Sequence, residues 1–219
     1  MPIGSWLETV RAWDVAGFYL INRTLRHTLL DSVVPLMTYW NVALPVGLIF
    51  LYVMVFRPKR DRIVAICAIA VILLANETTQ LIKELLQRIR PCHVLEHAYI
   101  QKGTLCTSSF SLPSNHASNM FAMASVFSYN SKWLAVPCFV AAAFVAYSRV
   151  YVGAHYPADV LAGLALGLLV GFPGAIVVER LTRAREQGRS RPFAEGRDEV
   201  PAGSGSPQPS GAPGECELR

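Results

Sequence analysis

The sequence predicts an all-α integral membrane bundle of five or six transmembrane helices. Apolar residues make up 53% of the 219 residues, only 16% are charged, and the mean hydropathy is +0.35, which departs from soluble domains. A helix needs about 20 mostly apolar residues to cross a bilayer. Four stretches are long enough, and a fifth becomes so if it begins at Ser114. In order, the five stretches are 33–56, 63–86, 117–129, 133–152 and 156–178.

The same pattern divides the chain into three regions. Residues 1–32 mix apolar with charged positions, which predicts an interfacial or membrane-associated helix and leaves a sixth span as the alternative. Residues 33–180 form the transmembrane domain. Residues 181–219 begin as a basic segment and end in a Gly/Pro/Ser run, which predicts a disordered cytoplasmic tail because it cannot bury apolar surface.

Basic residues between the spans indicate the orientation. Short basic loops stay on the cytoplasmic side, and these residues all fall on one side of the predicted bundle: Arg57, Lys59, Arg60, Arg62, Lys132, Arg180, Arg183, Arg185, Arg189 and Arg191. We therefore expect a multi-pass protein of the cell (inner) membrane. The net charge of +5 reflects this anchoring and an anion site, so nucleic-acid binding is not expected.

The second predicted span carries a polar stripe. Asn76, Gln80, Lys83, Gln87 and Arg90 recur at steps of three or four residues, so they share one helix face. Such residues are costly in hydrocarbon and mark a bundle interior or a wet cavity. Two structural alternatives stay open: hydrogen bonding between helices for the amides, and snorkelling to the headgroups for the two cations.

Two other polar segments have the pattern of helix starts. In the segment 113–116, Ser114 is a good N-cap, and the following amides would point toward an anion. Pro157 suits the first position of the last helix, so His155 lies just before it and Asp159 in its first turn. An Asp four residues after a His can accept the ring N–H and fix its tautomer.

Counting the spans brings all three segments to the extracytoplasmic face. Together they supply three cations, two histidines and one carboxylate, which can bind a phosphoryl group, attack it and protonate the leaving oxygen. No nucleotide-binding glycine loop is present, so the phosphate belongs to the substrate. In order, these residues are Lys83, Arg90, His116, Arg149, His155 and Asp159.

These motifs resemble the type 2 phosphatidic acid phosphatase (PAP2) superfamily, which shares its phosphate site with vanadium haloperoxidases. The chain gives Lys83, six residues and Arg90-Pro91; then Pro-Ser-Asn-His at 113–116; then Ser-Arg at 148–149, five residues, His155, three residues and Asp159. The resemblance covers roughly residues 60–180. Asn115 replaces the usual Gly of the second motif. We expect activity to persist, because the backbone N–H survives and Asn tolerates unusual backbone angles.

The resemblance implies a role for each residue. His155 would be the nucleophile that becomes a phosphohistidine, Asp159 would orient it, and His116 would protonate the leaving oxygen and later activate water. The phosphate oxygens would be neutralised by Lys83, Arg90, Ser114, Asn115 and Arg149. No metal or other cofactor is expected, since cations replace Mg²⁺ and the chain has no HExxH-type spacing for zinc.

The implied activity is hydrolysis of a membrane lipid phosphate or diphosphate within the bilayer. Undecaprenyl diphosphate is the favoured substrate, by analogy at the family level. Phosphatidylglycerophosphate, phosphatidate and the 1-phosphate of lipid A are alternatives. A lipid phosphotransferase or a non-enzymatic transporter is a more distant interpretation, because the polar residues of a span also suit a transport pathway.

Two cysteines lie in the loop predicted on the outer face. Cys92 and Cys106 would close about 15 residues, and oxidising conditions permit a disulfide there, worth on the order of 3 kcal/mol. Two free or buried thiols are the alternative.

Overall fold

The computed structural model describes residues 3–38, 43–101 and 106–189, and every regular element in this part of the chain is helical, which confirms the all-α fold class. In order, the elements are α1 (Ile3–Tyr19), the π-helical segment η1 (Leu20–Thr24), α2 (Thr28–Thr38), α3 (Ala43–Phe56), α4 (Lys59–Leu86), α5 (Pro91–Val94), α6 (Asn115–Asn130), the 3-10 turn η3 (Lys132–Leu134), α7 (Ala135–Tyr151) and α8 (Pro157–Arg189).

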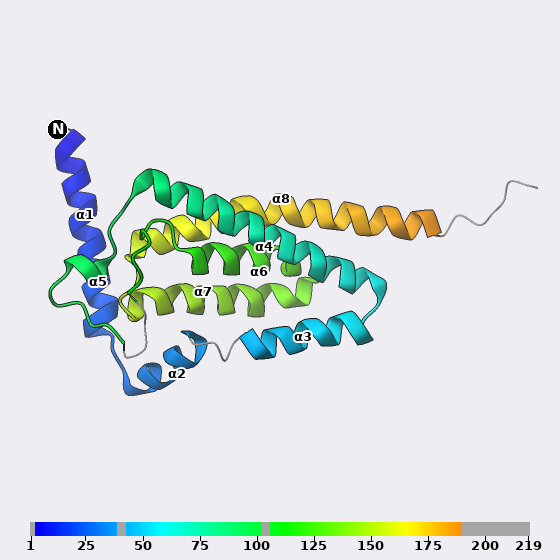
Figure 1. Ribbon diagram of the computed structural model, residues 1–219, viewed down its shortest axis with the longest axis horizontal. Coiled ribbons are helices and arrows are strands. Elements are labelled where there is room, and N and C mark those ends of the chain that lie inside the picture. The colour runs from blue at the N-terminus through cyan, green and yellow to red at the C-terminus, as the bar shows by residue number, and fades with distance from the viewer. Residues whose placement is uncertain (1–2, 39–42, 102–105, 190–219) are drawn as a thin grey trace, which may run out of the picture.

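Four helices form a bundle around α6. Figure 1 shows α4, α6, α7 and α8 running side by side, with α6 packed against the other three and α2 and α3 along one side. The short helix α5 lies at the end of the bundle crossed by α1. The segment 1–32, predicted as an interfacial helix with a sixth span as the alternative, includes α1, which lies across that end of the bundle.

The helices differ in their capacity to cross a membrane. Within the described part of the chain, three stretches are long and apolar enough, Lys59–Val94, Lys132–Tyr151 and Pro157–Gln187. The other two predicted spans are shorter as helices, since α3 has 14 residues and α6 has 16. In α6, small and polar side chains such as Ser118 and Ser125 are buried among the neighbouring helices, so this helix does not need an apolar outer face.

Two predicted boundaries are wrong. The helical segment predicted to begin at residue 33 begins earlier, at Thr28; its described parts are α2, which ends at Thr38, and α3, from Ala43 to Phe56, while residues 39–42 lie outside the described residues. Residues 181–189, which the prediction placed in the disordered tail, are helical, because α8 continues to Arg189. A helix can extend beyond the apolar core without an apolar face, so composition alone placed its end too early. Residues 190–219 of that tail lie outside the described residues.

Glycines on α8 let it approach α6 closely. Gly163, Gly167 and Gly171 follow one another at one-turn intervals, and a Cβ at the first two would lie 2.6 Å from the carbonyl oxygen of Ser114 and 2.5 Å from that of Ser118. Only residues without a side chain permit this backbone contact. The N-terminal ends of α6 and α8, which carry two of the three motifs, are therefore held together.

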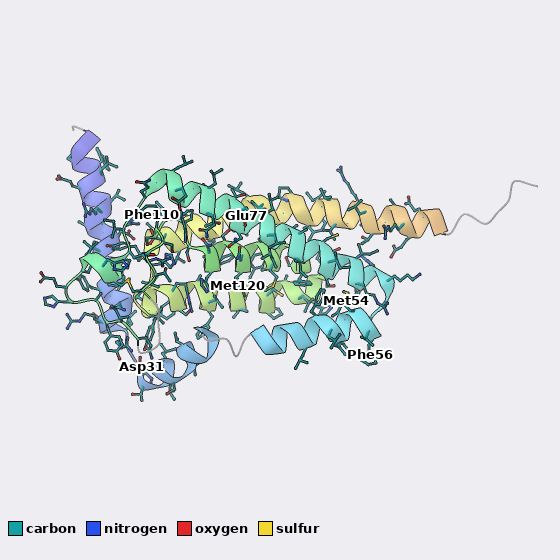
Figure 2. All side chains as sticks on the ribbon, viewed as in Figure 1. Asp31, Met54, Phe56, Glu77, Phe110 and Met120 are labelled. Atoms are coloured by element: carbon teal, nitrogen blue, oxygen red, sulfur yellow. A yellow bond between two sulfur atoms is a disulfide. The ribbon has the colours of Figure 1, made fainter. Side chains whose placement is uncertain are left out.

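The two ends of the bundle differ in chemistry. Figure 2 places Asp31 at the end crossed by α1 and Phe56 at the opposite end. The basic residues of 57–62 follow Phe56, and Lys132 follows α6, so both lie at the end away from α1. The C-terminal end of α4, the N-terminal ends of α6 and α8 and the C-terminal end of α7 meet near α1, so all three motifs share one end of the bundle.

Candidate active site

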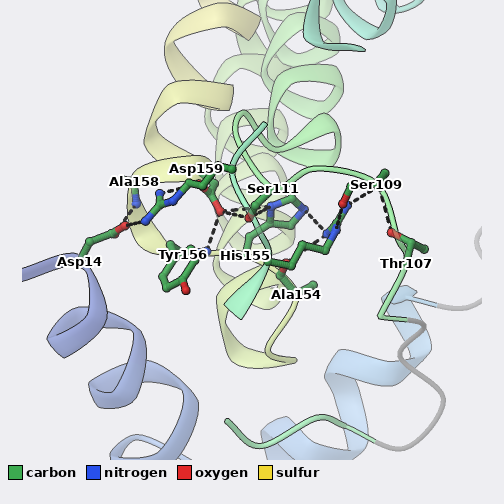
Figure 3. Close-up of polar contacts among 11 residues, drawn as sticks. Asp14, Thr107, Ser109, Ser111, Ala154, His155, Tyr156, Ala158 and Asp159 are labelled. Atoms are coloured by element: carbon green, nitrogen blue, oxygen red, sulfur yellow. Dashed lines mark hydrogen bonds and ion pairs between the residues drawn. The ribbon is translucent and has the colours of Figure 1, made fainter. Parts of the chain in front are cut away.

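His155 is the centre of the polar cluster at this end. It lies in the turn between α7 and α8 and is 3% exposed. Its Nε2 atom is 3.1 Å from Nη1 of Arg90, and its Nδ1 atom is 3.5 Å from Oδ2 of Asp159. A guanidinium can only donate hydrogen bonds, so Nε2 accepts and the ring proton is on Nδ1, facing the carboxylate (Figure 3).

The backbone fixes Arg90 in this contact. Its Nε donates to the carbonyl oxygen of Ser109 at 2.7 Å, its Nη2 to the Ser109 hydroxyl at 2.9 Å, and its Nη1 to the carbonyl oxygen of Ala154 at 3.1 Å. Arg90 directly precedes α5, whose first residue is Pro91. Proline is favoured at the first position of a helix. The guanidinium is therefore held rigidly beside the imidazole.

Asp159 is fully buried in the first turn of α8 and makes contacts through both carboxylate oxygens. Oδ2 accepts the backbone N–H of Tyr156 at 2.8 Å and the hydroxyl of Ser111, while Oδ1 accepts Nη1 of Arg88 at 2.7 Å. The Ser111 hydroxyl is also 3.5 Å from Nδ1 of His155, and Figure 3 shows it between the two side chains. This network fixes the carboxylate on the Nδ1 side of the imidazole.

The environment keeps His155 in its neutral form. Burial is the main reason that the pKa of this imidazole lies below its ordinary value. The charges of Arg90 and Lys83 lower the pKa further, whereas Asp159 opposes them. A neutral ring with its proton on Nδ1 has an unprotonated Nε2, which accepts a hydrogen bond from Arg90 in this structure and is the atom that a nucleophile requires.

The second motif opens α6 beside this cluster. Ser114 is fully buried at the N-cap position, but its hydroxyl does not cap the helix and has no hydrogen-bond partner among the described residues. Its backbone N–H donates to the carbonyl oxygen of Asp159 at 2.9 Å. Asn115 donates to the side chain of Asn76 at 3.1 Å. His116, in the first turn, is exposed. Ser114 therefore occupies the predicted N-cap position without the expected side-chain cap hydrogen bond.

The remaining cations are buried around the same point. Lys83 is 3% exposed and Arg149 is 4% exposed. Arg149 contacts the Ser148 hydroxyl through Nε at 3.2 Å and through Nη2 at 3.1 Å. Electrostatic interactions connect His116 with Arg149, His155, Lys83 and Arg90. The structure therefore brings together the residues that the three motifs predict.

The polar stripe predicted on the second span does not continue as one helix face. Asn76 pairs with Asn115, and Lys83 is buried. Gln80 and Gln87 are exposed, and α4 ends at Leu86, where Gln87 adopts a left-handed conformation with φ 47°. Arg90 reaches the site from the segment after the helix, because this turn redirects the chain.

The loop over residues 91–112 contains the two cysteines. A disulfide joins Cys92 to Cys106, with their Cα atoms 6.3 Å apart. His93 places Nε2 3.3 Å from the Cys106 sulfur, and these three residues are the only group of metal-type ligands found in the described part of the chain. Sulfurs bonded to each other are not the thiolates that bind metals, so this group is not a metal site in its present form.

The fold and the site define a class of protein. It is an all-α membrane protein in which a buried neutral imidazole, a carboxylate and three cations meet at one end of the bundle. Such a set suits transfer of a phosphoryl group. Comparison with known families agrees with this chemistry. The family model of the PAP2 superfamily matches residues 64–183, so the chain belongs to that superfamily.

Curated relatives of the chain are lipid phosphatases, and a solved structure shares its fold. An undecaprenyl-diphosphatase from Sulfolobus acidocaldarius is 31% identical over 163 residues, which cover 73% of this chain and 76% of that protein. A lipid A 4'-phosphatase from Bacteroides thetaiotaomicron is 28% identical over 54% of this chain and 57% of its own length. The crystal structure of a PAP2-type phosphatidylglycerolphosphate phosphatase from Bacillus subtilis has a TM-score of 0.59 and 23% identity, covering 84% of this chain and 89% of that one. The chain is a membrane lipid phosphatase, a phosphoric monoester hydrolase.

Proposed function

We propose that this phosphatase hydrolyses undecaprenyl diphosphate through a phosphohistidine on His155, at a site facing the extracytoplasmic side of the cell membrane. One observation carries the chemical part of the proposal: Nε2 of a buried imidazole accepts from Arg90, while Nδ1 faces Asp159. The unprotonated Nε2 therefore faces the guanidinium of Arg90, which is the cation that would hold the phosphoryl group.

The proposed reaction has two steps. In the first, Nε2 of His155 forms a bond to the terminal phosphorus of the diphosphate, the bond from that phosphorus to the bridging oxygen breaks, and His116 gives a proton to that oxygen, which leaves as part of the lipid monophosphate. In the second, His116 takes a proton from water, which attacks the phosphohistidine and releases phosphate. Asp159 keeps the ring proton on Nδ1 and stabilises the positive charge that develops on the imidazole.

The other predicted site residues would bind the non-bridging oxygens. Lys83, Arg90 and Arg149 provide positive charge in a buried setting, where electrostatic stabilisation is strong. The unpartnered hydroxyl of Ser114 is a hydrogen-bond donor for the phosphate. The backbone N–H of Asn115, at the N-terminal end of α6, is a further donor.

The substrate is proposed from three considerations. An undecaprenyl-diphosphatase is 31% identical to this chain and covers 73% of it. An interfacial helix at the site end suits a lipid whose phosphates lie at the headgroup level while its tail stays in the bilayer. The basic residues at the opposite end favour an extracytoplasmic site. The lipid A relative makes the phosphate of lipid A the main alternative.

Phosphate release from single lipids tests the substrate. The purified protein in detergent is given undecaprenyl diphosphate, lipid A, phosphatidylglycerophosphate and phosphatidate in turn, with His155→Ala as the inactive variant and His97→Ala, an exposed histidine outside the site, as the matched control. We expect the highest kcat/KM on undecaprenyl diphosphate and no turnover by His155→Ala. Equal rates on all four lipids would indicate a broad phosphatase. Dephosphorylated lipid without free phosphate would indicate a phosphotransferase.

A further inference from the structure

Asp14, which is buried, and Arg88, which is partly buried, connect the N-terminal helix to Asp159. We propose that they are positioning residues for the reaction, which hold Asp159, and through it His155, so that α1 completes the active site. The inference rests on the proposed role of the His155 and Asp159 pair. Asp14 lies outside residues 64–183, the part of the chain that the family model matches.

Arg88 bridges two carboxylates with the two arms of its guanidinium. Nη1 donates to Oδ1 of Asp159 at 2.7 Å, and Nη2 donates to Oδ2 of Asp14 at 2.5 Å. Its Cζ atom also lies 4.1 Å from the centre of the Tyr156 ring, a distance at which a cation is attracted to an aromatic face. The planar group is thus fixed on both edges and on one face, which a lysine ammonium could not reproduce.

Asp14 connects the same network to the start of α8. Its side chain is largely buried, and while Oδ2 accepts from Arg88, Oδ1 accepts the backbone N–H of Ala158 at 2.8 Å. Ala158 is in the first turn of α8, directly before Asp159, where helix N–H groups have no partner within the helix. Figure 3 shows Asp14 on one side of this turn and His155 on the other. Asp14 therefore supports Asp159 both through Arg88 and through the helix backbone.

The burial of these charges makes the bridge energetically important. Without Arg88, Asp14 and Asp159 would be two buried carboxylates with no guanidinium between them, and an uncompensated buried charge is strongly unfavourable. The carboxylates would move apart or become protonated. Either change removes the fixed acceptor on the Nδ1 side of His155. Neither Asp14 nor Arg88 forms a hydrogen bond with Arg90 or with the Ser114 hydroxyl. Removing either residue should therefore disturb the position of the nucleophile more than the binding of phosphate.

The kinetic expectation is a fall in kcat with little change in KM. A misplacement of about 1 Å at a reacting group can cost about 100-fold in rate, so Arg88→Gln and Asp14→Asn should each lower kcat by about 10- to 100-fold. Arg88→Lys keeps the charge but not the two-armed geometry, and should recover part of the loss. Glu8→Gln, a charge change on the exposed side of the same helix, is the matched control and should leave kcat unchanged.

The experiment measures kcat and KM of the full-length chain in detergent on para-nitrophenyl phosphate and on the four lipids, together with thermal unfolding. Because Asp14 and Arg88 belong to one network, the double variant Asp14→Asn/Arg88→Gln should lose less activity than the product of the two single losses. A double loss equal to the product of the single losses would overturn the proposal. So would kcat within twofold of wild type for both single variants, or a general fall in unfolding temperature with parallel changes in KM.

The two substrate arms separate this inference from the proposed function. If wild type hydrolyses para-nitrophenyl phosphate but none of the lipids, the proposed lipid substrate fails, while the variants still test the positioning role on the soluble ester. If wild type hydrolyses the lipids and both single variants retain full kcat, the proposed function stands and the positioning role fails.

Discussion

Gly153→Ala tests whether the turn before His155 sets the geometry of the nucleophile. Gly153 has φ +87°, a conformation that side chains with a Cβ rarely adopt, and it lies between Arg149 and His155. The turn is tight: the backbone N–H groups of Ala154 and His155 both donate to the carbonyl oxygen of Arg149, at 3.0 and 3.2 Å. Any shift at Gly153 therefore moves the imidazole.

The magnitude follows from two local contacts. A Cβ at Gly153 would lie 2.7 Å from the carbonyl oxygen of Tyr99, so one side must move by about 0.7 Å to reach ordinary contact. Tyr99 cannot easily retreat, because buried Asn22 bonds both its N–H, at 2.7 Å, and its C=O, at 2.9 Å. The left-handed backbone adds about 1–2 kcal/mol of strain. A shift approaching 1 Å at His155 corresponds to a loss of about 10- to 100-fold in kcat.

The assay compares kcat on para-nitrophenyl phosphate and the unfolding temperature in detergent. Gly17→Ala is the matched control, since a Cβ there would meet only the Pro157 ring at 3.4 Å, an ordinary contact, and alanine suits the interior of α1. We expect Gly17→Ala to keep full activity and Gly153→Ala to lose both kcat and stability. Wild-type kcat and unfolding temperature in Gly153→Ala would refute the reasoning.

Four further predictions concern single groups. Ser111→Ala removes a hydrogen bond to the buried carboxylate, worth about 1.5–3 kcal/mol, and should lower kcat at least about tenfold with KM unchanged; an unaltered kcat would argue against it. Burial lowers the pKa of His155 from 6.5, so the ring stays neutral in more acidic solution, and the acid limb of the kcat/KM profile should lie below pH 6.5 rather than at or above it. Asn115→Gly keeps the backbone N–H and should retain turnover; inactivity would mean that the amide side chain is required. Thiol labelling without reductant should leave Cys92 and Cys106 unmodified, and full labelling of both would show that the bridge is absent.

The fold class and the meeting of the three motifs could be predicted from the sequence. Apolar stretches give the bundle, and counting them brings Lys83, His116 and His155 to one end, because each crossing reverses the direction of the chain. What could not be predicted is where a helix starts or stops when composition does not change there. Examples are the start of α2 at Thr28 and the continuation of α8 to Arg189.

The supporting residues of the site were harder to find than the motif residues. Arg88 lies within the first motif, two positions before Arg90, and an extended segment points alternate side chains to the same side. This two-residue spacing from Arg90 is the sequence feature that could have identified Arg88 as a site residue. Ser111 and Asp14 had none, because a lone serine in a loop and a lone acid in an amphipathic helix are ordinary features. Only tertiary packing brings them to Asp159.

The most direct test of the account is the identity of the phosphorylated residue. The protein is mixed rapidly with para-nitrophenyl phosphate, denatured in base, where phosphohistidine survives, and mapped by mass spectrometry. The account predicts an acid-labile phosphate on His155, absent from His155→Ala and accumulated in His116→Ala, which should hydrolyse the intermediate slowly. Phosphate on a different residue, or continued turnover by His155→Ala, would contradict it.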